Sequence, residues 1–424
     1  MSDRRPIRFD DLMAHHRCQQ PRITPDAQSV VFVATHPDVS QNRNLSHLYR
    51  VPLAGGDVVQ LTQHGSTCSD PAISPDGRWI AFTSNRQGDT SQVWLLPVDG
   101  GEAHPVTDLY LGARRPVWTP DGAYLLVISP VYRDSNDPDE IVRRETERPR
   151  GEVRPRLIDD LMFRHWDEWT EDRIDHLFSI DIHTGAARDL SPGPYPVPPR
   201  SLTGEPDYAV CVDGSEICFV SLRDPDQARS TNSNLWIMAA AGGASCRISP
   251  REGCNAYPVY SPGGDRIAYC GMRRSGYEAD RRELLVFDRA SGETREVAPG
   301  FDRSVEPPVW SPDSEFLFFA AQDRGATRLF RVPSAGGEPE PLTHGATDLE
   351  PVVSPDGAWL VFQRQTSTAP PEICRTPVGG GGAEALTTFN ADRLAALDLH
   401  PVDDFWYTGA KAARVHGFLL KPPG

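Results

Sequence analysis

The sequence predicts an all-β fold, a seven-bladed β-propeller with four-stranded antiparallel blades, and three observations support this. A Ser/Thr-Pro-Asp-Gly type of turn followed by a short apolar strand recurs at intervals of 43–50 residues, with one longer interval of 92 residues. Each unit has a second half, in which an alternating strand ends at a Gly-containing turn. Repeats of about 40–50 residues with four strands each are typical of propeller blades. The 40 prolines and 35 glycines favour short strands and turns over long helices.

The recurring turn closes the first hairpin of each unit. Pro fixes φ, Asp bonds the backbone two residues further on, and Gly accepts a positive φ. We therefore expect the aspartates of these turns to be structural and not catalytic. The turns begin at Thr24, Ser74, Thr119, Cys211, Ser261, Ser311 and Ser354, and their aspartates are Asp26, Asp76, Asp121, Asp213, Asp313 and Asp356.

Three segments lie outside the repeat. Residues 1–20 lead into the first unit and include FDDLMAHH, a predicted short helix. The longer interval places an insertion at residues 130–176 in blade three, and the Pro-rich residues 191–200 are an extended connector to the next blade. The repeat ends near residue 393, so the propeller is expected to span residues 21–393.

Charge and hydropathy exclude several classes of function. The net charge of −16 makes contact with nucleic acid or anionic lipid unfavourable and suits a cationic or amine-bearing ligand better. No run approaches the roughly 18 apolar residues of a membrane span, and the N-terminus has no apolar signal region. We expect a soluble cytoplasmic protein with no nucleic-acid or membrane partner.

Cysteines and histidines give no sign of a metal centre. The eight cysteines form no C-x-x-C pair and mostly lie in apolar runs, so free buried thiols are expected. The twelve histidines show no H-x-x-x-H spacing, and the adjacent His15 and His16 are placed on a solvent-facing helix. The sequence predicts no metal and no cofactor.

Three segments together resemble one enzyme family. They are IRFDDLMAHHRCQQPRITPDAQSVVFVAT (residues 7–35), MFRHWDEWTEDRIDHLFSIDIHTG (162–185) and VHGFLLKPPG (415–424). With the turns, they resemble the N-terminal propeller of the prolyl oligopeptidase family of serine peptidases, in its acylaminoacyl and dipeptidyl peptidase branch. In that family a strand like HGFLLKPPG introduces an α/β-hydrolase domain. The resemblance implies that residues 394–424 are a linker and the first strand of a hydrolase domain that is absent.

No serine in the chain has Gly at both −2 and +2, as the G-x-S-x-G nucleophile of that family requires. The chain is therefore expected to have no catalytic residue and to be inactive alone. The resemblance implies a domain that gates short peptide substrates and selects their N-terminus for a serine exopeptidase. Its partner is the α/β-hydrolase domain, in the same polypeptide or a separate chain.

The blade-three insertion holds the candidate substrate-binding residues. Its segment HWDEWTED sets carboxylates beside two indoles, and such a group can receive a peptide's α-ammonium by charge-assisted hydrogen bonds and cation–π contact. In the alternative, the indoles pack the blade edge and the acids are solvated. The nearby arginine-rich residues 143–156 are expected to neutralise a substrate carboxylate, to dock against the acidic remainder of the protein, or to form a solvated, self-paired loop. The candidates are Trp166, Asp167, Glu168 and Trp169.

Two further hypotheses come from the rest of the chain. A stand-alone interaction propeller, similar to TolB-like proteins, is the main alternative function. The tail at residues 400–424 is expected to expose Phe405, Trp406, Phe418 and Leu419 when no hydrolase domain covers it, and then to self-associate or to be disordered. The expected partners therefore include a second copy of this chain.

Overall fold

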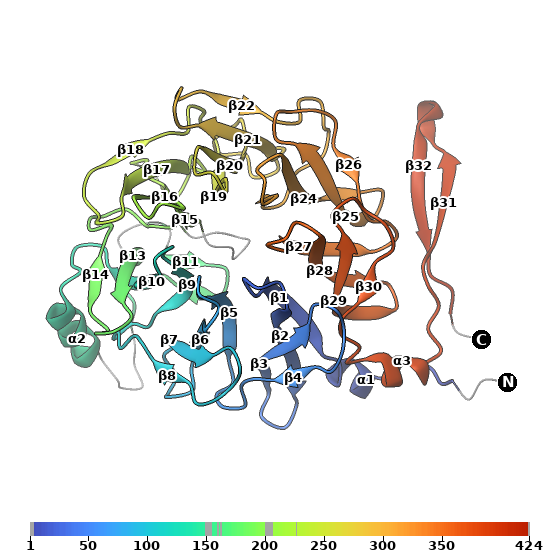
Figure 1. The fold of residues 1–424 in the computed structure, drawn as a ribbon, viewed down its shortest axis with the longest axis horizontal. Helices are drawn as coiled ribbons and strands as arrows, with labels where there is room; N and C mark the ends of the chain where they lie inside the picture. The colour runs from blue at the N-terminus through green and yellow to red at the C-terminus, as the bar shows by residue number, and fades with distance from the viewer. Residues whose placement is uncertain are drawn as a thin grey trace. The chain divides into compact units, whose positions relative to one another are not determined.

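The computed structural model describes residues 4–148, 155–158, 161, 163–199, 207–225 and 227–422. Two compact units divide the chain: residues 1–69, 318–331 and 340–424 form the first, and residues 70–317 and 332–339 form the second. Four-stranded antiparallel sheets recur along both (Figure 1). The all-β prediction and the four-stranded units are confirmed.

The first unit contains the first sheet, with order β1-β2-β3-β4, and a group with order β27-β28-β29-β30. That group continues an eight-stranded sheet through one parallel pair, Thr327 with Thr347. The elements of the first sheet are α1 (Phe9–Met13), β1 (Arg17–Ile23), β2 (Ser29–Asp38), β3 (Arg43–Pro52) and β4 (Val59–Gln60). Those of the eight-stranded sheet are β23 (Val309–Trp310), β24 (Phe316–Asp323), β25 (Ala326–Pro333), β26 (Glu340–Pro341), β27 (Thr347–Val353), β28 (Trp359–Thr366), β29 (Ala369–Pro377) and β30 (Glu384–Ala385).

The second unit holds most of the other sheets, each drawn from one continuous stretch of chain. One sheet has β5 (Cys68–Ile73), β6 (Trp79–Ser84), β7 (Gln92–Pro97) and β8 (His104–Pro105); the next has β9 (Arg114–Trp118), β10 (Tyr124–Tyr132), β13 (Arg173–Asp181) and β14 (Ala187–Asp189). Two more contain β15 (Tyr208–Val210), β16 (Glu216–Ser221), β17 (Asn234–Ala239) and β18 (Ser245–Arg247), and β19 (Asn255–Tyr260), β20 (Arg266–Gly271), β21 (Glu283–Asp288) and β22 (Thr294–Glu296).

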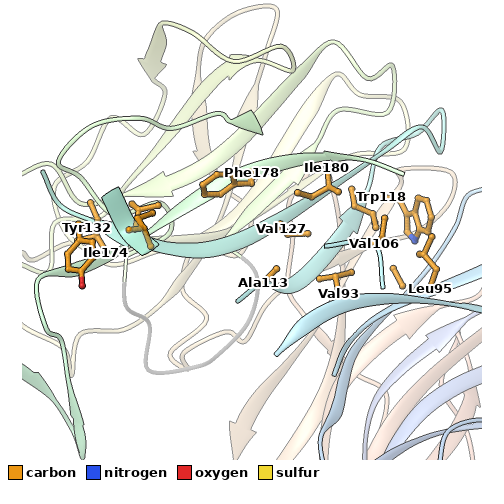
Figure 2. Packing of buried hydrophobic residues seen from close by; sticks show 14 residues of the cluster. Val93, Leu95, Val106, Ala113, Trp118, Val127, Tyr132, Ile174, Phe178 and Ile180 are labelled. Atoms are coloured by element: carbon orange, nitrogen blue, oxygen red, sulfur yellow. The ribbon is translucent and has the colours of Figure 1, made fainter. Parts of the chain in front are cut away.

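The core lies between neighbouring sheets, so the middle strands are buried on both faces. β6, for example, has five buried residues after Trp79. Figure 2 shows one cluster, in which Val93 and Leu95 of β7 pack against Val127 of β10 and Phe178 of β13. Packing apolar faces sheet on sheet supplies the main favourable free energy of such a fold.

The turn chemistry is as predicted. In the first turn, Thr24 Oγ1 donates to Asp26 Oδ1 at 2.6 Å, and the same oxygen accepts the Gln28 N–H. The hydroxyl bond lowers the pKa of Asp26 most, the Gln28 N–H lowers it further, and burial opposes both. Ser261 has Gly263 where the aspartate would stand, and it bonds Asp265 at 2.7 Å instead. Equivalent hydroxyl bonds reach Asp76, Asp121, Asp313 and Asp356. At Asp213, whose turn begins with Cys211, the donor is instead the Ser215 hydroxyl.

A repeated backbone distortion was not anticipated. The residue before a proline on the first strand of several sheets has a positive φ of 53–61°, although residues before proline favour extended backbone. In three cases the N–H of that residue donates to a side chain outside its own sheet. Gln20 donates to Glu350 of β27, and Arg115 donates to Thr83 of β6. Tyr257 donates to Asp207, which directly precedes β15. The residues concerned are Gln20, Asp70, Arg115, Tyr257 and Glu350.

Three expectations need adjustment. Helix α1 ends at Met13, and His15 is buried, so the two histidines do not lie on a solvent-facing helix. Strands β10 and β13 pair as far as Tyr132 with Arg173, so the inserted segment is residues 133–172 rather than 130–176. Six cysteines are buried free thiols, whereas Cys246 is exposed and Cys254 is half-buried.

Candidate functional site

The insertion begins with a helix fixed to the strands on either side. Helix α2 (Pro138–Glu147) has Pro at its first turn, and the Asp137 side chain accepts the Asp139 N–H at 3.0 Å. The Tyr132 hydroxyl, at the end of β10, donates to Glu145 at 2.6 Å, and Arg173, at the start of β13, also binds Glu145. These contacts give the insertion a rigid base.

A small hairpin carries the predicted site residues. β11 (Arg164–His165) pairs with β12 (Glu168–Trp169), and Trp166 and Asp167 form the turn between them. Trp166 has φ 51° and is 74% exposed. A non-glycine residue in left-handed backbone is strained, and such strain is concentrated at functional sites. The structure therefore presents one indole at the tip of the insertion.

The four acids of the segment have different surroundings. Glu171 binds Arg148 at 2.5 Å, with Arg173 at 3.6 Å and Arg156 at 3.8 Å. Burial by itself would raise the pKa of Glu171, but the hydrogen bond from Arg148 and the neighbouring guanidinium charges outweigh it and lower that pKa. Glu171 is therefore a carboxylate whose charge is balanced by arginines, and its role is structural.

Asp167 and Glu168, in contrast, are exposed. Neither has an ion-pair partner among the residues that the structure describes around the hairpin. Their charges remain available to a cationic ligand.

The two indoles also differ. The Trp169 ring stacks on Phe163 at 6.0 Å between centroids, and the Arg156 guanidinium lies 4.3 Å from its centroid. Trp169 is thus already engaged with a cation. Of the four predicted residues, Trp166, Asp167 and Glu168 lie together at the turn of the hairpin, and Trp169 lies at its opposite end.

The described part of the arginine-rich run is paired with acids. Arg143 binds Glu140 at 2.7 Å and Glu147 at 2.5 Å, and Arg144 binds Asp134 and Glu140, both at 2.7 Å. Residues 149–154 of the run lie outside the described residues. The paired arginines are not free to bind a substrate carboxylate.

The second unit has a hollow that no sequence pattern indicated. Its volume is about 430 Å³, and no charged side chain among the described residues lines it. The lining comes from the ends of several first strands, so no single repeat carries a signal for it. The lining residues include Trp118, Pro120, Tyr208, Tyr257, Pro258, Tyr260, Pro307 and Pro308.

Beyond α3 (Ala391–Ala395), the tail forms a hairpin of β31 (Asp403–Thr408) and β32 (Arg414–Leu419), with the short helix η1 (Ala410–Ala412) in its turn. Phe405, Trp406, Phe418 and Leu419 are 39–53% exposed, as expected. Phe418 sits over Gly325, where a Cβ atom would lie only 2.0 Å from the ring. The tail is thus ordered, and its aromatic surface is largely uncovered.

Two other kinds of site do not occur among the residues that the structure describes. In the described ranges, no three His, Cys, Asp or Glu side chains are grouped so that they would hold a metal ion. No helix among the described residues is long and apolar enough to cross a membrane.

Comparison with known proteins gives the family. The model of the TolB beta propeller domain matches residues 12–149 and 205–397. Dipeptidyl-peptidase 5 of Porphyromonas gingivalis is 29% identical over 418 residues, which cover 97% of this chain and 60% of that protein. Dipeptidyl-peptidase 5 of Aspergillus fumigatus is 30% identical over 300 residues, 63% of this chain and 41% of the relative. The chain therefore spans 60% or less of these two relatives.

Solved structures agree on the fold. Pyrococcus horikoshii acylaminoacyl peptidase has a TM-score of 0.74 at 18% identity, over 98% of this chain and 60% of its own. The β-propeller domain of the Trilobed protease from Pyrococcus furiosus has a TM-score of 0.59 at 16% identity, over 88% of this chain and 99% of its own. The resemblance to the propeller of prolyl oligopeptidase family peptidases is confirmed, and the chain belongs to the TolB β-propeller domain family.

Proposed function

We propose that this chain is the substrate-gating and N-terminus-selecting propeller of a serine exopeptidase of the dipeptidyl or acylaminoacyl peptidase type. It has seven blades, between residues 21 and 393, preceded by a lead-in at residues 1–20. Residues 394–424 connect it to an α/β-hydrolase domain, in the same polypeptide or a separate chain, which supplies the nucleophile. The propeller itself breaks no bond in the short peptide substrate.

The observation that supports N-terminus selection is the tip of the insertion hairpin. Asp167 and Glu168 carry negative charge there without an ion-pair partner among the described residues, and the Trp166 ring is exposed beside them. A peptide's α-ammonium would bond the Glu168 carboxylate and lie against the indole, with Asp167 adding charge. Fixing that end of the peptide restricts its orientation, which is how a positioning group assists a reaction elsewhere.

A binding titration tests this role on the chain itself. We expect Ala-Ala-Ala-amide to bind through its free amine and its N-acetylated form to bind at least about tenfold more weakly, because one charge-assisted hydrogen bond contributes about 1.5–3 kcal/mol. Glu168→Gln should remove this difference. Isothermal titration calorimetry at low salt measures both.

Glu293→Gln is the matched control, because Glu293 is an exposed acid on the turn between β21 and β22. It should bind the two peptides as the wild type does. Equal affinity of the wild type for the free and acetylated peptides would contradict N-terminus selection.

The stand-alone interaction propeller is the second candidate, and the uncovered aromatic hairpin β31–β32 favours a protein partner. Intact mass of the protein from its natural source, with and without a fluorophosphonate probe for activated serines, separates the two. A labelled heavier species, or a labelled chain that co-purifies, supports the peptidase role. An unlabelled 46.8 kDa species supports the interaction module.

A further inference from the structure

Three histidines gather where the first sheet of the first unit meets the last. His15 and His16 lie between α1 and β1, and His36 lies near the end of β2. The His16 ring centroid is 4.9 Å from that of His36 and 5.1 Å from that of Phe389, which follows β30. His15 is only 7% exposed. The junction of the two sheets is thus lined with imidazoles.

The same residues hold the two sheets together through their backbone. The His16 N–H donates to Asn390 Oδ1 at 2.9 Å, and Asn390 Nδ2 donates to the His16 carbonyl at 3.0 Å. Glu372 of β29 fixes the Asn390 side chain with a bond of 2.9 Å. One amide side chain therefore links the backbone before β1 to strand β29, and we call this set of contacts the histidine clasp (His15, His16, His36, Phe389 and Asn390).

The surroundings of the clasp disfavour positive charge. Burial lowers the pKa of His16 most, and the charges of His36, Arg393 and His15 add to it. Burial also lowers the pKa of His15, helped by Arg393 on α3 and Arg17 on β1.

Nearby acids offer little compensation. Asp11 on α1 opposes the shift of His15, but two bonds of 2.7 Å bind its carboxylate to Arg5. The Glu372 carboxylate is occupied by Asn390 and Thr387.

The ring nitrogens add a second cost. His15 Nε2 and His36 Nδ1 are buried atoms with no hydrogen-bond partner among the described residues. A protonated imidazole needs an acceptor for each of its two N–H groups. A proton placed on either of these nitrogens would be a buried, unsatisfied donor.

We propose that the histidine clasp is an acid-sensitive switch, which holds the first and last sheets together while the His15 and His16 imidazoles are neutral and releases them when these two imidazoles are protonated. In the unfolded or opened chain the His15 and His16 rings titrate near the ordinary value of about 6.5. Since the closed clasp keeps them neutral, its stability is complete above that pH and is lost progressively below it. One histidine held neutral makes opening about tenfold more favourable at pH 5.5.

Hydrogen exchange of the full chain measures this opening directly. We expect the segments 14–24 and 386–397 to lose protection by at least about tenfold between pH 7.5 and pH 5.5, after correction for the intrinsic rate. Segments of the second unit should keep their protection. His16→Phe keeps a ring on Phe389 and the backbone bonds to Asn390 but cannot titrate, so the loss of protection should be smaller.

His183→Gln is the matched control, because His183 is exposed on the turn between β13 and β14. It should show the full wild-type response to pH. Unchanged protection of the junction in the wild type at pH 5.5 would overturn the proposal, and so would a response that persists at full size when both His15 and His16 are replaced by Phe. The wild-type comparison needs no variant, so a folding defect in a variant leaves the proposal testable.

Discussion

Asp348 is fully buried, and its two carboxylate oxygens accept from Arg364 at 2.7 and 2.8 Å. The two residues face each other directly across strands β27 and β28. No sequence motif predicts such a pair, because the partners are 16 residues apart and meet only when the strands pair in register. The turn aspartates were predictable for the opposite reason, since their partners lie within two residues.

At this residue scale we predict that Asp348→Ala lowers the free energy of unfolding by about 3–5 kcal/mol, because it leaves the Arg364 charge without its partner. Urea unfolding followed by tryptophan fluorescence measures the change. Glu147→Ala, which breaks an exposed pair on α2, is the control and should leave the midpoint unchanged. Equal effects of the two substitutions would refute this account of Asp348.

At the scale of elements, the first strands of the sheets show a feature that the sequence did not predict. The turn, strand and Gly turn of each repeat were predictable because they depend on residues close together in the chain. The prolines after Gln20, Asp70, Arg115, Tyr257 and Glu350 are equally visible. The acceptors for the N–H groups of Gln20, Arg115 and Tyr257, however, come from outside the sheets of these residues. The insertion shows the same limit, since the pairing of Glu171 with three arginines separates it from Glu168 only in the folded chain.

The strand register shifts at most of these distortions, which we call bulges. We predict that Thr83→Val, which keeps the shape of the side chain but removes the acceptor at 3.1 Å, speeds exchange of the Arg115 amide up to about tenfold. Amide-resolved hydrogen exchange measures it. The exposed Thr184→Val is the control. Slow exchange at Arg115 in the Thr83 variant would show that this bond does not hold the bulge.

At the scale of the whole molecule, the tail hairpin β31–β32 exposes aromatic side chains to solvent. Its edges and aromatic faces resemble an unfinished sheet, and such surfaces associate. We predict that the chain forms concentration-dependent oligomers in sedimentation velocity, and that the double substitution Phe405→Ser and Trp406→Ser shifts it towards monomer. Glu384→Ser on the edge strand β30 is a control outside the tail. A wild type that stays monomeric at all concentrations would contradict this prediction.

The sheets' origin in continuous stretches of chain has a topological consequence for engineering. Arg5 and Leu397 already form a parallel bridge, with Asp398 N–H donating to the Arg5 carbonyl at 2.7 Å. A short peptide could therefore join these points, and new ends could be opened at residues 61–67, between β4 and β5. Such a circular permutant would lose the tail hairpin β31–β32 but retain every strand ladder from β1 to β30, so the order in which the repeats are translated is separable from the architecture they build.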